Sequence, residues 1–165
     1  MSTFALFKDI LLNHEGGTYV NDDHGRGPSK WGITLQTAQE FEPAWNPDTI
    51  RNLTRDQAGA FYEAHFWNHY NIGLLNSQDV ANKVCDLAVN VGPGTAIKFL
   101  QRAVGAHPDG VLGPATAAAA NAMNPDTVLA GVKQAGSDYY HQIAEVHPEW
   151  AADLPGWLSR LSSDV

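Results

Sequence analysis

Apolar residues recur at intervals of three and four along most of this chain, which is the spacing of one buried face of an α-helix. The first such run covers residues 4–14, and Ser2 or Thr3 is placed to cap its start. The glycine pair at 16–17 ends the run, because glycine readily terminates a helix. The pattern therefore predicts a helix with Glu15 at its C-terminal end.

Helical spacing returns later in the chain, at residues 33–41, 53–71, 77–92, 95–105, 109–123 and about 126–147. Thr34 and Thr54 are predicted N-caps, and Pro114 suits the first turn of its helix. Residues 42–49, "EPAWNPDT", are predicted to form a loop marked by prolines. The apolar tail "LPGWLSRL" at 154–161 is expected to pack back on the rest of the protein.

The stretch between residues 18 and 34 interrupts the helical pattern. Gly25, Gly27 and Pro28 lie between two short segments, "YV" and "WGIT", that are typical of strands. A β-hairpin or an irregular lobe is expected here. The predicted fold is mainly α, of the α+β kind: a helical bundle with one small β-hairpin lobe.

The composition indicates a globular protein of one domain, or of one domain with a small lobe. Of the 165 residues 44% are hydrophobic and 17% are charged, and no apolar run reaches the roughly 18 to 20 residues that span a bilayer. We expect a soluble chain without a membrane span, and the first residues show no secretory signal pattern. The single cysteine, Cys85, cannot form an internal disulfide and suits folding in a reducing cytoplasm.

The formal net charge is −8, with only 10 Lys and Arg residues. Nucleic acid is therefore not expected as a partner, because phosphate binding needs a concentrated basic surface. The same charge means that any anionic polymer must be held by local contacts, against the average field of the protein.

Glu15 is the first candidate for chemistry. A carboxyl group at a helix C-terminus faces the negative end of the helix dipole, and apolar neighbours would add to the cost of ionising it. Such a group is suited to donate a proton, as the general acid of a glycoside hydrolase does to the leaving oxygen. A solvated glutamate at a helix end is the more common interpretation of the same spacing.

A second group would have to stabilise the oxocarbenium-like centre or activate water. Asp22 and Asp23 are the only carboxylates between Glu15 and Glu40, and a hairpin starting near Tyr19 could bring either one across from Glu15. Their separation would distinguish retaining geometry, at about 5 to 5.5 Å, from inverting geometry, at about 6.5 to 9.5 Å. Neighbouring aspartates in a Gly-rich stretch are more often turn residues.

Several motifs resemble one known family. "HEGGTYVNDDHGRGPSKWGIT" resembles the opening motif of the glycoside hydrolase family 108 muramidases, lysozyme-like enzymes found largely in phages and prophages. "FYEAHFWNHYNI" resembles the Tyr-containing helix of that family. "CDLAVNVGPGTAIKFLQRAVG", "DGVLGPAT" and the terminal "GWLSRL" resemble the peptidoglycan-binding region that usually completes such chains. The motifs follow the family's order and cover nearly all of the chain.

Carried over residue by residue, the resemblance makes Glu15 the catalytic acid. Asp22 corresponds to the aspartate of the family's Asn-Asp pair, as nucleophile, base or structural residue. Ser29 and Thr34 lie where lysozyme-like folds often place a small hydroxyl that holds the attacking water. We take Glu15, Asp22 and Thr34 as catalytic candidates and Ser29 as a substrate-binding candidate.

The sequence departs from the family pattern at three places. Thr18 separates the Glu-Gly-Gly motif from "YV" and lengthens the spacing to Asp22 by one residue. Lys30 stands where a neutral amide is typical, and Arg26 adds a second positive charge beside an anionic glycan. Trp31 replaces a tyrosine and should keep a stacking surface. Lys30 and Trp31 are therefore substrate-binding candidates.

Four later residues complete the predicted binding set. Tyr62 and Trp67 could stack on a sugar ring, or they could belong to the core, as we expect for Phe66. Asp86 and Asn90 lie one helical turn apart and face the same way, so they could bind an N-acetyl sugar or its peptide. The alternative is that they cap the following Gly-rich turn.

No metal or other cofactor is expected. His65 and His69 have the i, i+4 spacing of helical zinc ligands, but no third ligand has matching spacing. Solvated histidines on a helix face are the simpler interpretation. Cys85 has no base beside it in the sequence and is expected to be a small buried residue.

The resemblance implies a muramidase that cleaves the β-1,4 bond between N-acetylmuramic acid and N-acetylglucosamine in bacterial peptidoglycan, with residues 1–91 as the catalytic region and 92–165 as the peptidoglycan-binding region. It implies a monomer that reaches the cell wall through a holin or a secretion apparatus after synthesis in the cytoplasm. Two alternatives stay open: a non-catalytic wall-binding or assembly module, and a zinc amidase or peptidase.

Overall fold

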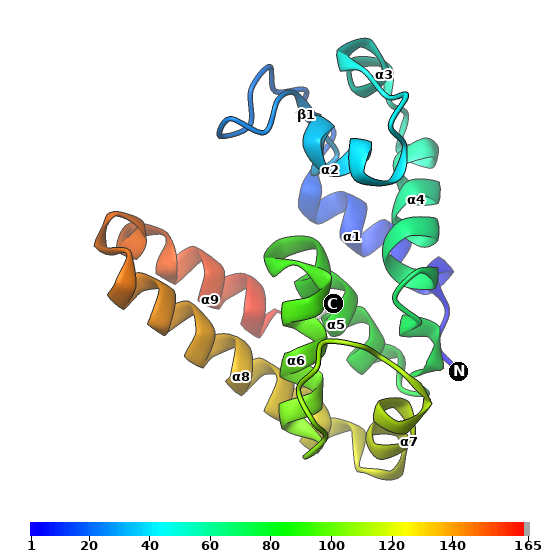
Figure 1. Cartoon of the computed structure of the whole chain (residues 1–165), viewed down its shortest axis with the longest axis vertical. Coiled ribbons are helices and arrows are strands. Elements are labelled where there is room, and N and C mark those ends of the chain that lie inside the picture. The colour runs from blue at the N-terminus through cyan, green and yellow to red at the C-terminus, as the bar shows by residue number, and fades with distance from the viewer. Residues whose placement is uncertain (164–165) are drawn as a thin grey trace. The chain divides into compact units, whose positions relative to one another are not determined.

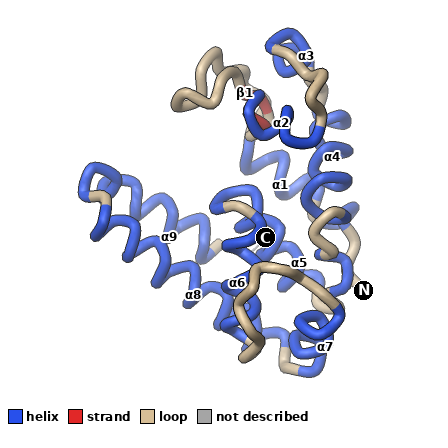
Figure 2. Tube along the Cα trace, in the orientation of Figure 1, coloured by secondary structure: helices blue, strands red, loops and turns tan. Residues whose placement is uncertain are grey.

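A computed structural model describes residues 1–163 of the chain (Figure 1). These residues form two compact units. The N-terminal unit is Phe4–His65. The C-terminal unit consists of Met1–Thr3 and of the chain from Phe66 onward. Most of both units is helical, and the two strands pair in a short antiparallel hairpin, so the predicted mainly α fold with a β-hairpin lobe is confirmed (Figure 2).

The N-terminal unit is built from short elements: η1 (Phe4–Leu6), α1 (Lys8–Glu15), β1 (Ser29–Lys30), β2 (Ile33–Thr34), α2 (Leu35–Phe41), α3 (Pro47–Asn52) and α4 (Arg55–Tyr62). Helix α1 packs against α4, and its residues Leu11 and Leu12, like Phe7 just before it, are completely buried. A π-helical segment, η2 (Glu63–Asn68), continues from α4 and passes from the N-terminal unit into the C-terminal one.

The predicted cap of the first helix is wrong. A 3₁₀ turn precedes α1, and Phe7 occupies its N-cap position without a side-chain capping bond. Ser2 and Thr3 instead belong to the C-terminal unit, where their backbone N–H groups are bonded. The N–H of Ser2 bonds to the carbonyl of Leu75 at 3.0 Å, and that of Thr3 bonds to Oε1 of Gln78 at 2.9 Å.

The β element turns at a different place from the one predicted. Ser29 pairs with Thr34 and Lys30 with Ile33, so the chain reverses at Trp31 and Gly32, in the middle of the predicted "WGIT" strand. Both turn residues have positive φ, 56° and 74°, as a two-residue type I′ hairpin requires. Val20 pairs with Ser29 on the other side, which gives the "YV" segment its place beside β1.

The caps of α2 and α4 are confirmed. The Thr34 hydroxyl accepts the N–H of Thr37 at 3.1 Å, and Thr54 forms a reciprocal capping box with Gln57. The predicted loop at 42–49 is partly wrong, because α3 begins within it at Pro47.

Asn46 explains the start of α3. Its side chain accepts the N–H groups of Asp48 and Thr49 at 3.0 and 3.1 Å, while Pro47 occupies the first turn. Six residues are too few to show a helical period in the sequence.

The C-terminal unit contains longer helices, namely η3 (Ile72–Leu74), α5 (Gln78–Val91), α6 (Pro93–Ala103), α7 (Pro114–Ala122), α8 (Pro125–Val146), η4 (Pro148–Asp153) and α9 (Leu154–Ser162). Helix α8 packs against α5, α6 and α9, and the tail at 154–161 does pack back as predicted. Close approach is possible because Gly131 faces Ala103 and Gly136 faces Leu161, where a Cβ would lie within 2.9 Å of either neighbour.

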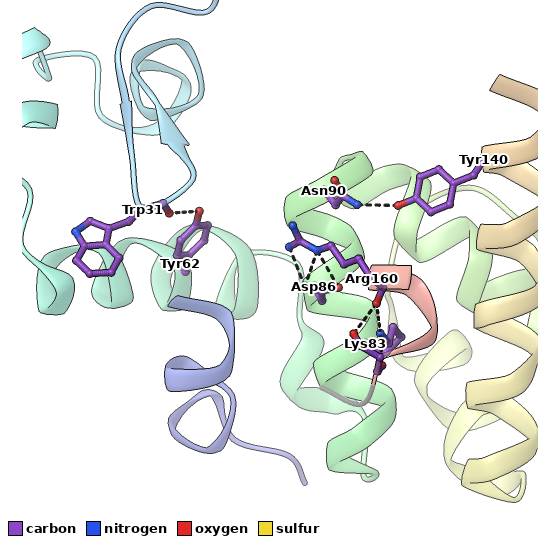
Figure 3. A network of polar contacts seen from close by, with 8 residues as sticks. Trp31, Tyr62, Lys83, Asp86, Asn90, Tyr140 and Arg160 are labelled. Carbon is purple, nitrogen blue, oxygen red and sulfur yellow. Dashed lines mark hydrogen bonds and ion pairs between the residues drawn. The ribbon is translucent and has the colours of Figure 1, made fainter. Parts of the chain in front are cut away.

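A buried polar network joins α9 to α5 in the C-terminal unit (Figure 3). Asp86 is 1% exposed and accepts the guanidinium of Arg160 at 2.9 Å. Lys83 is also buried, and its ammonium donates to the carbonyls of Arg160 and Ser163 at 3.3 and 2.9 Å. The buried carboxylate is therefore ion-paired and the buried ammonium is hydrogen-bonded, as the burial of charged groups requires.

None of the helices in the described part of the chain combines the length and the hydropathy that crossing a bilayer requires.

Candidate active site

Glu15 is the last residue of α1, as predicted, and is half-buried. Gly16 ends the helix with its N–H bonded to the carbonyl of Leu12 at 3.1 Å and with a φ of 69°, a conformation that a side chain would strain. A Cβ built on Gly16 would meet no atom within 4 Å, so the space beside the end of the helix is open.

The tip of the hairpin lies against the Glu15 carboxyl group. A Cβ on Gly32 would clash with the Glu15 carboxyl, at 2.8 Å from its Cδ, and would lie 2.8 Å from the Tyr62 hydroxyl. The carboxyl group, the hydroxyl and the backbone of Gly32 therefore meet at one point. Any other residue here would have to displace the Glu15 carboxyl or the Tyr62 hydroxyl.

Trp31 has a conformation that is rare for a bulky side chain, and three contacts maintain it. Its carbonyl accepts the Tyr62 hydroxyl at 2.9 Å (Figure 3). Its indole N–H donates to the carbonyl of Leu53 at 3.2 Å. Its ring covers Gly17, where a Cβ would lie 2.7 Å from ring carbons. The Gly16–Gly17 segment after Glu15 therefore packs directly against the Trp31–Gly32 turn.

Asp22 and Asp23 both organise the Gly-rich loop. Oδ1 of Asp22 accepts the N–H groups of Gly25 and Gly27 at 3.1 and 3.2 Å, which is turn chemistry. Asp23 pairs with the guanidinium of Arg26 at 3.2 Å. The catalytic role of Asp22 stays a prediction.

The two predicted hydroxyls are buried. Ser29 is 5% exposed on β1, and Thr34 is 2% exposed with its hydroxyl engaged at Thr37 as the cap of α2. The observed contacts of Thr34 are therefore structural, and its role in holding a water stays a prediction.

Lys30 belongs to a group of cations around the hairpin. Its ammonium donates to the carbonyl of Arg51 at 3.0 Å, and the Arg51 guanidinium lies 4.6 Å from the centre of the Tyr19 ring. Arg55 lies 5.7 Å from the centre of the Trp31 ring. Sequence reasoning missed Arg51 and Arg55, because their link to the hairpin crosses more than 20 residues. The one available signal was Tyr19 in "YV", because an aromatic ring can attract a cation.

The other predicted binding residues divide between the units. Tyr62 is 1% exposed and positions the hairpin through Trp31. Trp67 is 4% exposed and belongs to the C-terminal unit, as do Asp86 and Asn90. Asp86 is paired with Arg160, whereas Asn90 is exposed and donates its amide to the Tyr140 hydroxyl at 2.8 Å.

The histidines and the cysteine have ordinary surroundings. His65 stacks on Phe41, with ring centres 4.7 Å apart, and bonds to Glu42 at 3.2 Å. Within residues 1–163, no three His, Cys, Asp or Glu side chains are grouped to hold a metal ion. Cys85 is fully buried as predicted, and burial raises the pKa of its thiol well above the ordinary range.

Comparisons with known proteins bear on the same segments. A family model described as glycosyl hydrolase 108 matches residues 8–92, and one described as a predicted peptidoglycan domain matches residues 95–162. The chain is also similar to the structure of SagA from Brucella abortus, with 28% sequence identity, a TM-score of 0.76, and coverage of 96% of this chain and 92% of that one. A search of curated protein sequences found no match.

The family models meet between α5 and α6, whereas the compact units divide between His65 and Phe66. The predicted division at residues 91 and 92 stays a prediction. The first family match spans more than half of the chain and contains Glu15, the hairpin and Tyr62. The resemblance seen in the motifs is thereby confirmed: the chain belongs to the glycosyl hydrolase 108 family and is a glycosyl hydrolase that acts on peptidoglycan.

Proposed function

We propose that the chain is an N-acetylmuramidase, which cleaves the β-1,4 bond between N-acetylmuramic acid and N-acetylglucosamine with Glu15 as general acid. One observation carries the proposal. The Glu15 carboxyl is placed by a helix end and a hairpin tip, within the segment that matches the hydrolase family. Gly16 follows Glu15 directly and Gly32 lies at the facing turn, so the carboxyl is bordered by glycine backbone and by the Tyr62 hydroxyl.

The chemistry requires a proton at the glycosidic oxygen as the bond to the anomeric carbon breaks. Glu15 supplies that proton in this proposal. Tyr62 is a positioning residue. Its hydroxyl donates to the Trp31 carbonyl, and this bond fixes the turn that contacts the Glu15 carboxyl. A bulky polysaccharide can approach because Gly16 opens onto free space.

Asp22 is our choice for the second group. The loop N–H groups bond to one of its two carboxylate oxygens, Oδ1. By contrast, the Asp23 carboxylate pairs with Arg26, and the Thr34 hydroxyl caps α2. Two backbone N–H bonds would hold Asp22 in a fixed orientation, with Oδ2 left to face the anomeric carbon or a water.

The substrate lies outside the cytoplasmic membrane. We propose that the protein acts on wall peptidoglycan after release through a holin or delivery by a secretion apparatus. Local cations on the N-terminal unit, Lys30, Arg51 and Arg55, would offset the net charge of −8 near an anionic wall.

The direct test is digestion of purified peptidoglycan by the unsubstituted protein and by Glu15→Gln, with borohydride reduction and mass spectrometry of the fragments. We expect reduced muramic acid ends, lost at least about 1000-fold in Glu15→Gln. Asp22→Asn should also lose most activity, whereas Asp23→Asn on the same loop serves as the matched control.

Three outcomes would contradict the proposal. Reduced glucosamine ends would indicate cleavage of the other glycosidic bond. Freed stem peptides from intact glycan would indicate an amidase or peptidase. Sedimentation with peptidoglycan without any cleavage would indicate a binding or assembly module.

A further inference from the structure

The C-terminal unit contains an aromatic groove of about 300 Å³, at the low end of the volumes that ligand sites have. It is lined chiefly by Asn90, Tyr139, Tyr140, Trp150 and Trp157, from α5, α8, η4 and α9. We propose that this groove binds an N-acetylated sugar of a neutral glycan segment. The identification of that glycan as peptidoglycan rests on the proposed function.

The rings of the groove are held by their neighbours. Trp150 stacks on His147 with ring centres 4.2 Å apart and planes at 25°, yet 44% of Trp150 stays exposed. Tyr140 lies 5.5 Å from Trp157 at 31°. Trp150 and the partly exposed Trp157 therefore present supported aromatic rings to solvent, whereas Tyr140 is only 3% exposed. The C–H faces of a pyranose pack well on such surfaces.

Asn90 provides a polar group with a fixed orientation. Its side-chain N–H donates to the Tyr140 hydroxyl at 2.8 Å (Figure 3). This bond orients the amide, which lines the groove. Burial raises the pKa of Tyr140 to about 12, so the phenol stays neutral over the physiological range. The carbonyl oxygen and the second N–H of Asn90 match the N–H and C=O of an acetamido group.

The charges around the groove favour a neutral ligand. No Lys, Arg, Asp or Glu is among the described residues that line it. Two nearby carboxylates already have partners: Asp86 pairs with Arg160 at 2.9 Å, and Glu149 with His147 at 3.2 Å. A stem peptide carries free carboxylates and would find no cation in the groove. The observations therefore favour the sugar over the peptide of a wall polymer.

The test uses the full chain carrying Glu15→Gln, so that no ligand is cleaved, labelled with ¹⁵N. The indole N–H signals of its five tryptophans report binding of a β-1,4-linked N-acetylglucosamine tetramer and, separately, of a stem tetrapeptide. The signals of Trp150 and Trp157 are assigned from the single Trp→Phe variants. We expect both to shift saturably with the tetramer and to stay unchanged with the peptide.

Substitutions then locate the site. We expect Trp150→Ala to weaken tetramer binding at Trp157 about tenfold and Asn90→Ala about fivefold, with Trp150→Phe retaining most of the affinity. Val146→Ala is the matched control, because Val146 is a 66% exposed apolar residue near the end of α8 that does not line the groove. Circular dichroism shows whether each variant remains folded.

Tetramer shifts confined to Trp31 or Trp45 would overturn the proposal, since the sugar would then bind the N-terminal unit alone. Shifts caused only by the peptide would also overturn it. Failure of the muramidase proposal is a separate event, seen as absent or altered fragments in the digest. Glycan binding in the groove would stand in that case.

Discussion

The two compact units hold their candidate sites by different means. Around Glu15, backbone geometry determines the positions of the groups. Gly16 and the Trp31–Gly32 turn have positive φ, and Gly32 approaches the carboxyl so closely that a Cβ there would clash with it. In the C-terminal unit, side-chain pairs between long helices do it, through Asn90 with Tyr140 and Asp86 with Arg160. We therefore expect the first site to be sensitive to small steric changes and the second to depend on how well its polar side chains are paired.

The largest expected effect on stability is in the C-terminal unit. Arg160→Met leaves the carboxylate of Asp86 buried and without its guanidinium, and we expect about 3 kcal/mol less free energy of unfolding. Urea unfolding followed by circular dichroism measures it.

Arg55→Met is the matched control for Arg160→Met. The Arg55–Asp9 pair has the same 2.9 Å separation, but the Asp9 side chain is 80% exposed. We expect a loss below about 1 kcal/mol there. Equal losses in the two variants would show that burial of Asp86 does not determine the strength of its ion pair.

The next effect tests the steric control at Glu15. Gly32→Ala forces a methyl group into the Glu15 carboxyl and the Tyr62 hydroxyl at a φ of 74°. We expect about 2 kcal/mol less stability and at least about 100-fold slower peptidoglycan cleavage, because the carboxyl must move. Unfolding curves and initial rates measure the two losses.

Gly105→Ala separates backbone strain from crowding, at a position outside the candidate site. Gly105 has a φ of 71°, yet a Cβ there would meet nothing within 4 Å. This variant should lose about 1 kcal/mol and keep most of its activity. A similar loss of activity in both variants would contradict the role given to the contact between Gly32 and Glu15.

A pH-dependent effect is expected in the core of the C-terminal unit. Burial raises the pKa of the Cys85 thiol above its ordinary value near 9.0, so folding opposes formation of the thiolate. This contribution to stability is complete below pH 9 and declines above it, by about 1.4 kcal/mol per pH unit. Urea unfolding between pH 8 and about 10.5 measures it.

Cys85→Ala isolates the thiol from the tyrosines and lysines that titrate in the same range. Its stability should fall less steeply with pH than that of the unsubstituted protein. Parallel pH profiles would contradict the effect of burial on Cys85.

Sequence patterns predicted most helices because their determinants are local. The spacing in α5 and α8, the caps Thr34 and Thr54, and the proline at the start of α7 all act within a few residues. The six-residue α3 was not predicted, because a helix of that length is too short to show the helical period of apolar residues. The Trp31–Gly32 turn was not predicted either, since an aromatic residue rarely has positive φ and the sequence of this segment is typical of a strand.

The candidate site was predictable only in part, for a related reason. The position of Glu15 at a helix end follows from the adjacent glycine pair. Its neighbours Gly32 and Tyr62 come from segments 17 and 47 positions later, and only the folded hairpin brings them together. Likewise, the bond from Asn90 to Tyr140 spans 50 residues and leaves no local pattern.

The smallest expected effect on stability separates positioning from packing at Glu15. Tyr62→Phe removes the hydrogen bond to the Trp31 carbonyl but keeps the buried ring, so we expect about 1 kcal/mol less stability. Because this bond fixes the hairpin tip beside the carboxyl, kcat for peptidoglycan cleavage should fall about tenfold while KM changes little. Tyr19→Phe is the matched control, since the bond that the Tyr19 hydroxyl accepts from Arg51 is long, at 3.4 Å. An equal fall in kcat for both variants would mean that the hydroxyl of Tyr62 has no special role, and that the N-terminal site is held by packing in the same way as the core.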